Sequence, residues 1–108
     1  MSSIIKGTTP TIKLDFSTFE ADVNDIVKIS MLCKQGDKVW DISDDVELDC
    51  SRGTAAYHFS QSVTLALQKN EELYIEVDVL MNDGEVYRVA ADSFNVEPTL
   101  RKGELTNE

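Results

Sequence analysis

Apolar and polar residues alternate along much of this chain, and this period of two constrains its fold more than any other feature. In residues 73–81 every second side chain is apolar, while Glu76 and Asp78 fall between the apolar positions. Successive side chains of a strand point to opposite faces, so this pattern predicts a strand with one buried and one exposed face. Further segments with strand character occupy residues 11–16, 26–34, 38–42, 46–50, 55–59, 85–90 and 93–96. In the second of these, Val27 is predicted to share the buried face with Ile29, Met31 and Cys33.

Turn residues separate the predicted strands. Glycine occurs in short polar connections at residues 35–37, 52–54 and 82–84. The Asp83-Gly84 pair tolerates the positive φ angles of a tight hairpin, so a hairpin is predicted there. Tyr74 and Tyr87 are predicted to pair across this hairpin. Pro98 ends the pattern, because a proline cannot donate a hydrogen bond to a strand ladder.

One segment breaks the strand pattern. Residues 61–68 place apolar side chains at i, i+3 and i+4 spacing, which is typical of a helix. We expect a short helical turn there, with Ser60 or Ser62 as its N-cap and Asn70 as its closing residue.

The predicted fold is all-β: an antiparallel two-sheet β-sandwich, immunoglobulin-like, with seven or eight strands and one short helical turn. Strands with one apolar face are buried most simply by packing two sheets together, and a small closed barrel is the alternative. The 108 residues allow one domain, assigned to residues 1–100. Residues 101–108 form a polar C-terminal tail that is expected to fray.

The charge balance narrows the choice of partner. The chain has 20 Asp and Glu against 10 Lys and Arg, a formal net charge of -10. This balance argues against nucleic acid and against anionic membranes, both of which select basic surfaces. It fits a basic partner or an acidic assembly surface, and it also fits a surface that serves solubility alone. No apolar run reaches the roughly 20 residues that cross a bilayer, and the N-terminus does not resemble a signal peptide, so synthesis in the cytoplasm is expected.

Few residues carry a chemical signature. His58 falls on the polar side of its strand and is predicted to be a surface histidine without a catalytic role. The acidic stretch 37–49 lacks the glycine and the final glutamate of a calcium loop, so we expect a solvated loop and neither a metal nor a cofactor. Cys33 and Cys50 match no zinc pattern and are predicted to be reduced core residues, with a cross-strand disulfide as the alternative. No enzyme is predicted.

Trp40 is the one aromatic residue singled out as a candidate contact. It follows Val39 directly, so one of these neighbours must face away from the core unless the strand bulges or is covered on both faces. Packing of Trp40 in the core is one outcome, and an exposed indole that contacts a sugar or a partner is the other.

The chain opens with the run Ile4-Ile5-Lys6-Gly7-Thr8-Thr9-Pro10-Thr11-Ile12. This run is similar to the N-termini of small proteins encoded in tailed, siphovirus-type phages and prophages of Gram-positive bacteria. Similarity to that family continues in order at 27–36, 59–67, 73–96 and 99–101. The resemblance implies a β-sandwich similar in layout to the N-terminal domain of upper-baseplate proteins. It transfers no catalytic residue, because the family carries none.

The resemblance implies a non-enzymatic virion structural or assembly protein, with the tail or baseplate favoured, that docks onto other virion proteins or onto itself. Such a protein is made in the host cytoplasm and then enters the virion, and it can form a homo-oligomer. Ile4 and Ile5 would form an arm that adds to a neighbouring subunit's sheet, or they would start a strand of their own sheet. The alternative function is a monomeric binding module for a host-surface or cell-wall carbohydrate, in which Trp40 makes the contact.

Overall fold

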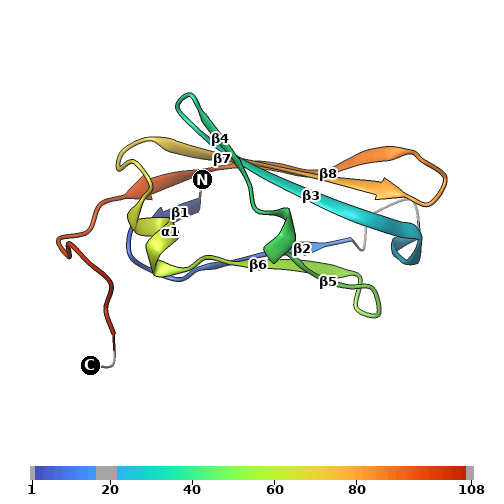
Figure 1. Cartoon of the computed structure of the whole chain (residues 1–108), viewed down its shortest axis with the longest axis horizontal. Helices are drawn as coiled ribbons and strands as arrows, with labels where there is room; N and C mark the ends of the chain where they lie inside the picture. Colours follow the sequence, from blue (N-terminus) through green and yellow to red (C-terminus); the bar gives the residue numbers. More distant parts are fainter. Residues whose placement is uncertain (1, 17–21, 107–108) are drawn as a thin grey trace.

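Two β-sheets face each other in the computed structural model, which describes residues 2–16 and 22–106 (Figure 1). The larger sheet has the order β1 (Ser2–Ile5), β8 (Val86–Glu97), β7 (Glu72–Met81), β3 (Ile26–Gln35) and β4 (Lys38–Asp41). The smaller sheet has the order β2 (Thr11–Asp15), β6 (Thr54–His58) and β5 (Glu47–Asp49). One α-helical turn, α1 (Gln61–Leu65), and two 3-10 turns, η1 (Val23–Asp25) and η2 (Ser43–Asp45), complete the described elements.

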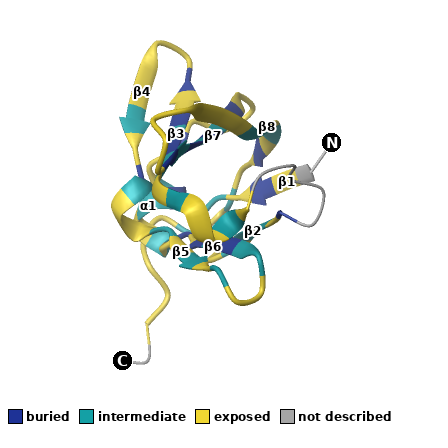
Figure 2. Ribbon diagram, turned by 90° about the vertical axis from the view of Figure 1, so that its right-hand side faces the viewer, coloured by how far each residue is buried: buried dark blue, intermediate teal, exposed yellow. Residues whose placement is uncertain are grey.

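The core lies between the two sheets, as the alternating pattern predicts. In β7 the apolar residues at every second position are buried, and the residues between them are partly exposed. Figure 2 shows the buried residues as dark blue segments along the strands. The buried cluster draws on both sheets and on the segment after α1: Ile4, Met31, Cys33, Ile42, Tyr57, Phe59, Leu67, Leu73, Ile75, Val77 and Val96. The two-sheet, mostly β prediction is therefore confirmed.

The sheets are not wholly antiparallel, which corrects one part of the prediction. β1 runs parallel to β8, with Ser2 opposite Phe94 and Ile5 opposite Glu97. After β1 the chain turns at Gly7 and enters β2 of the other sheet. No hairpin joins β1 to β8, so chain connectivity does not force an antiparallel pair.

Two irregularities in the strand register change what the alternating pattern predicts. Val27 was expected in the core, yet its side chain is 63% exposed. The β3–β7 register shifts between Ile26 and Lys28, and such a bulge reverses the face that a residue occupies. A second shift, opposite Val77 and Asp78, lies within one continuous β8, which unites the two segments predicted at 85–90 and 93–96.

The same register separates the two tyrosines. Tyr74 lies opposite Ser93, and Tyr87 lies opposite Val79. The predicted Tyr74–Tyr87 pair is therefore wrong.

The helical turn is present but shorter than expected. Ser60 is its N-cap, and its hydroxyl accepts a hydrogen bond from the Val63 N–H at 3.3 Å. The helix ends at Leu65, so Asn70 does not close it. Asn70 instead adopts a φ of 63° in the following loop, where its N–H donates to the Val96 carbonyl at 2.8 Å.

Residues 101–106 of the predicted polar tail are mostly exposed, and some of them form hydrogen bonds with the domain. The Arg101 Nη2 donates to the Gly7 carbonyl at 2.6 Å. The Gln61 side chain accepts from the Leu105 N–H and donates to the Leu105 carbonyl, both at 2.8 Å. These contacts hold residues 101–105 against α1 and the turn after β1. None of the described helices is both long and apolar enough to cross a membrane.

Candidate docking site

The Gly7-Thr8-Thr9-Pro10 run, the most specific part of the family resemblance, begins at a turn in which Gly7 is buried, while Thr8 and Thr9 are exposed. Gly7 has a φ of 82°, a conformation that favours glycine. Its N–H donates to the Thr64 hydroxyl at 3.0 Å, and that hydroxyl donates to the Thr8 carbonyl at 2.8 Å. Thr64 is fully buried, so this pair of hydrogen bonds ties the turn to α1. The run therefore has a structural role inside the domain.

This turn also determines where the candidate contacts Ile4 and Ile5 lie. Ile4 pairs with Val96, is 2% exposed and belongs to the core. Ile5 points to the opposite face of the sheet and is 46% exposed. The two residues thus start a strand of their own sheet, which was one of the two predicted outcomes. Ile5 remains accessible to a partner, whereas Ile4 is covered.

A cleft of about 520 Å³ opens between β2 and β8, the facing outer strands of the two sheets beyond the end of β1. Figure 2 shows β1 and β2 on this same side of the molecule. The walls include half-buried apolar residues of both strands, Ile12, Leu14, Ala90 and Phe94, and the buried Met31, Ile75 and Val77 lie deeper. The apolar interior of the sandwich thus lies directly behind the half-buried residues of this cleft.

The β8 backbone beside the cleft has a sheet edge that β1 does not cover. β1 pairs only with residues 94–97. The Lys6 N–H donates to the Glu97 carbonyl at 2.9 Å, so Glu97 directs its backbone groups toward β1. Backbone groups of alternate residues point to the same side of a strand, so Ser93 and Ala91 direct theirs toward the cleft. The Asp92 carboxylate accepts from the Ser93 N–H at 2.8 Å, in place of a neighbouring strand.

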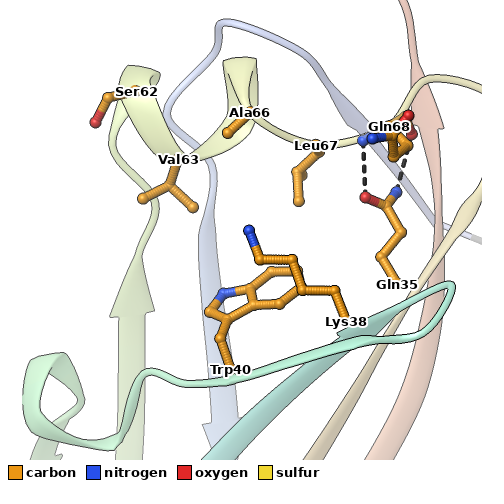
Figure 3. A pocket seen from close by; sticks show the side chains of 8 residues that line it. All are labelled: Gln35, Lys38, Trp40, Ser62, Val63, Ala66, Leu67 and Gln68. Carbon is orange, nitrogen blue, oxygen red and sulfur yellow. Dashed lines mark hydrogen bonds between the residues drawn. The ribbon is translucent and has the colours of Figure 1, made fainter.

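A second hollow, of about 430 Å³, lies between the β3–β4 hairpin and α1 (Figure 3). Trp40 is half-buried there and packs against the edge of the core, so its position is intermediate between the two predicted outcomes. The Lys38 Nζ lies 5.6 Å from the centroid of the Trp40 ring. Val63, Ala66 and Leu67 form the opposite wall. The pocket thus combines an apolar wall, an indole and one ammonium group.

Gln35 fixes one end of this pocket. Its side chain is buried, donates to the Gln68 carbonyl at 2.9 Å and accepts from the Gln68 N–H at 2.7 Å (Figure 3). The nitrogen and the oxygen of the Gln35 amide are therefore both used to hold the loop after α1 to the β3–β4 hairpin. In the sequence Gln35 is only part of a turn signal, and nothing there indicates that it is buried.

The remaining polar candidates do not converge. His58 is exposed on β6, as predicted for a surface histidine, and its Nδ1 lies 2.7 Å from the Thr11 hydroxyl. Within residues 37–49, hydrogen bonds from the Ser43 hydroxyl and N–H lower the pKa of Asp41. The Ser51 hydroxyl similarly lowers the pKa of Asp49. Among the described residues, no group of three or more His, Cys, Asp or Glu side chains is arranged to hold a metal ion.

The two cysteines lie in different surroundings. Cys33 is fully buried in the core, as predicted, and burial raises the pKa of its thiol to about 12. Cys50 is half-buried near η1, where its Sγ lies 3.7 Å from the Val23 carbonyl. Both thiols are free in the structure.

No protein-family model matches the chain, and a search of curated proteins finds no match. The functional assignment therefore relies on the sequence resemblance and on the geometry of the two hollows.

Proposed function

We propose that this protein is a non-enzymatic structural or assembly protein of a tailed phage or prophage, with the tail or baseplate favoured. It acts by docking onto other virion proteins or onto itself, and its sandwich is of the immunoglobulin-like type. It is made in the host cytoplasm and enters the virion. The observation that carries docking is the cleft between β2 and β8, where apolar core residues lie beside a stretch of β8 edge that no described strand pairs with. Such edges pair readily with strands of other chains.

The first test is the sequence of the DNA on either side of this reading frame, followed by mass spectrometry of particles purified from the strain that carries it. We expect neighbouring frames for a long helical tape-measure-like protein and for portal-like or holin-like proteins. We also expect this chain in the particles at a fixed ratio to the tail proteins. Metabolic or export genes on both sides, with the chain absent from particles, would contradict the proposal.

A second candidate is a carbohydrate-binding module, which the Trp40 pocket favours. An indole beside an ammonium group suits a sugar ring, whose faces are apolar and whose rim is polar. Titration with soluble cell-wall glycan fragments should then change the Trp40 fluorescence, and Trp40 is the only tryptophan in the chain. The variants Val63→Ala, in the opposite wall, and Val86→Ala, outside the pocket, give the matched comparison. An unchanged spectrum at saturating glycan would argue against this function.

A further inference from the structure

On the β1 side of β8, no strand among residues 2–16 and 22–106 pairs with the stretch before Phe94, and this stretch continues the line of β1. β1 adds to the sheet as a parallel strand along residues 94–97, with Ser2 opposite Phe94. On the N-terminal side of Phe94, alternation along β8 turns the Ala91 N–H and C=O away from β7, and the Asp92 carboxylate accepts from the Ser93 N–H at 2.8 Å. Neighbouring strands lie about 4.8 Å apart, so a strand added here would enter the space between β8 and β2.

We propose that this cleft binds an extended segment of a partner protein as an additional strand of the larger sheet. The segment has apolar side chains at alternate positions and lysine or arginine between them. This inference rests on the proposed docking function and specifies the kind of partner that docks.

The alternating pattern of the partner segment follows from the surroundings of the two faces of the added strand. One side of an added strand would face Ile12, Leu14, Ala90 and Phe94 across the cleft, and these residues are only half-buried in the structure. The other side would face solvent. Side chains of a strand alternate between its faces, so every second residue of the segment is apolar.

The basic residues follow from charge. The charged residues that line the cleft, Lys13 and Asp92, balance each other, so the net charge of 20 acidic against 10 basic residues favours a basic segment. A second copy also carries a net charge of -10, and two such copies repel each other. A partner of different sequence is therefore favoured over a second copy. Binding should weaken as salt concentration rises.

The test is selection from a yeast-displayed library of peptides of about ten residues, which span roughly 33 Å when extended. Alternate positions hold Val, Ile or Leu, and the positions between them vary among Lys, Arg, Glu, Asp, Ser and Thr. We expect the wild-type protein to retain peptides rich in Lys and Arg. Retention of no peptide would overturn the proposal, and retention of acidic and basic peptides alike would overturn its charge argument.

Two variants locate the binding. Ala90→Trp fills the cleft, because Ala90 lies opposite Val77 on the inner face of β8. Val86→Trp is the matched control, because Val86 is exposed on the same strand and lies outside the cleft. The first variant should weaken binding of a selected peptide by at least about tenfold, and the second should not. Equal binding by both variants would overturn the proposal.

Hydrogen exchange provides a readout that does not depend on the Ala90 variant's folding. A selected peptide should slow exchange of the wild-type Ala91 amide, and unchanged exchange at saturating peptide would count against strand addition. Light scattering tests whether a second copy of this chain occupies the cleft instead. A concentration-dependent dimer of the wild-type protein that Ala90→Trp abolishes would assign the cleft to a second copy and overturn the proposed partner.

The same variants separate this inference from the proposed function. If the wild-type chain is found in purified particles and Ala90→Trp enters them equally well, the cleft inference fails and the virion function stands. If basic peptides bind the cleft but the wild-type chain is absent from particles, the virion function fails and the cleft inference stands.

Discussion

At the scale of single residues, Gly7 is required both by its backbone conformation and by the space around it, and experiment can separate these two requirements. Its φ is 82°, and a Cβ placed there would lie 2.6 Å from the Arg101 Nη2. Gly53 is subject only to the first requirement, because its φ is 64° and a Cβ there has no neighbour within 4 Å. We expect Gly53→Ala to lower the free energy of unfolding by about 1–2 kcal/mol through backbone strain alone.

Gly7→Ala should lower the free energy of unfolding by about 1–3 kcal/mol more than Gly53→Ala, because it also displaces the Arg101 hydrogen bond to the Gly7 carbonyl. Urea denaturation measures both variants. In the background of Arg101→Ala the extra loss at Gly7 should shrink, since the obstructing side chain is gone. Equal losses for Gly7→Ala and Gly53→Ala would show that the crowding costs nothing.

The buried thiol predicts a pH dependence of stability. Burial raises the pKa of Cys33 from 9.0 to about 12, so the folded protein resists ionisation of this thiol. The unfolded chain ionises freely above its ordinary pKa and thus binds fewer protons than the folded state. The buried, protonated Cys33 thiol therefore contributes fully to stability below pH 9, and this contribution decreases as the pH rises from 9 toward 12.

Urea midpoints measured between pH 7 and pH 10.5 check this expectation. Cys33→Ala should lower stability at every pH but reduce the alkaline decline, while Cys50→Ala should leave the decline unchanged. Iodoacetamide at pH 8 should modify the half-buried Cys50 before Cys33 in the native protein. A decline of the same size in Cys33→Ala would assign it to other groups, such as Tyr57, whose pKa burial also raises.

At the scale of elements, β7, β3 and β1 show how much of a strand an alternating pattern can predict. The pattern identified β7 residue by residue, because that strand has one core face along its whole length. It could not reveal that Val27 is turned outward, because a bulge arises from the pairing of β3 with β7 and leaves no mark in β3 alone. Nor could it give the parallel direction of β1, which depends on contacts with β8, over eighty residues away.

The two isoleucines of β1 test whether this strand belongs to the domain. Ile4→Ala removes a core side chain that is 2% exposed and should cost about 2–5 kcal/mol of unfolding free energy. Ile5→Ala removes an exposed side chain of the same size and should cost about 0.5 kcal/mol or less. Chemical denaturation of the two variants gives the comparison. Similar small losses would mean that β1 does not contribute to the core in solution.

At the scale of the whole molecule, less of the candidate sites than of the fold could be predicted from local patterns. Trp40 could be singled out, because a large aromatic next to another apolar residue is unusual in an alternating strand. The other wall of its pocket comes from α1, more than twenty residues later in the chain, and no local pattern connects the two. The cleft between β2 and β8 was not predicted, because it depends on how far β1 extends along β8.

The net charge of -10 sets the last prediction, which concerns the molecule as a whole. Folding brings 20 carboxylates close together, and their mutual repulsion opposes the compact state. The screening length decreases from roughly 30 Å at 0.01 M salt to roughly 10 Å at 0.1 M. The free energy of unfolding should therefore rise as NaCl increases from about 0.01 M to about 0.3 M, as urea titrations at fixed pH would show.

A variant with fewer negative charges separates this repulsion from other effects of salt. Asp44→Lys and Glu104→Lys each add two positive units, so the net charge changes from -10 to about -6 and the repulsion, which grows with the square of the charge, falls to about a third. Both residues are exposed, so neither change disturbs the core. The salt response of this variant should be correspondingly smaller. An equal response would mean that salt acts on apolar burial, and the acidic surface would then cost the folded state little.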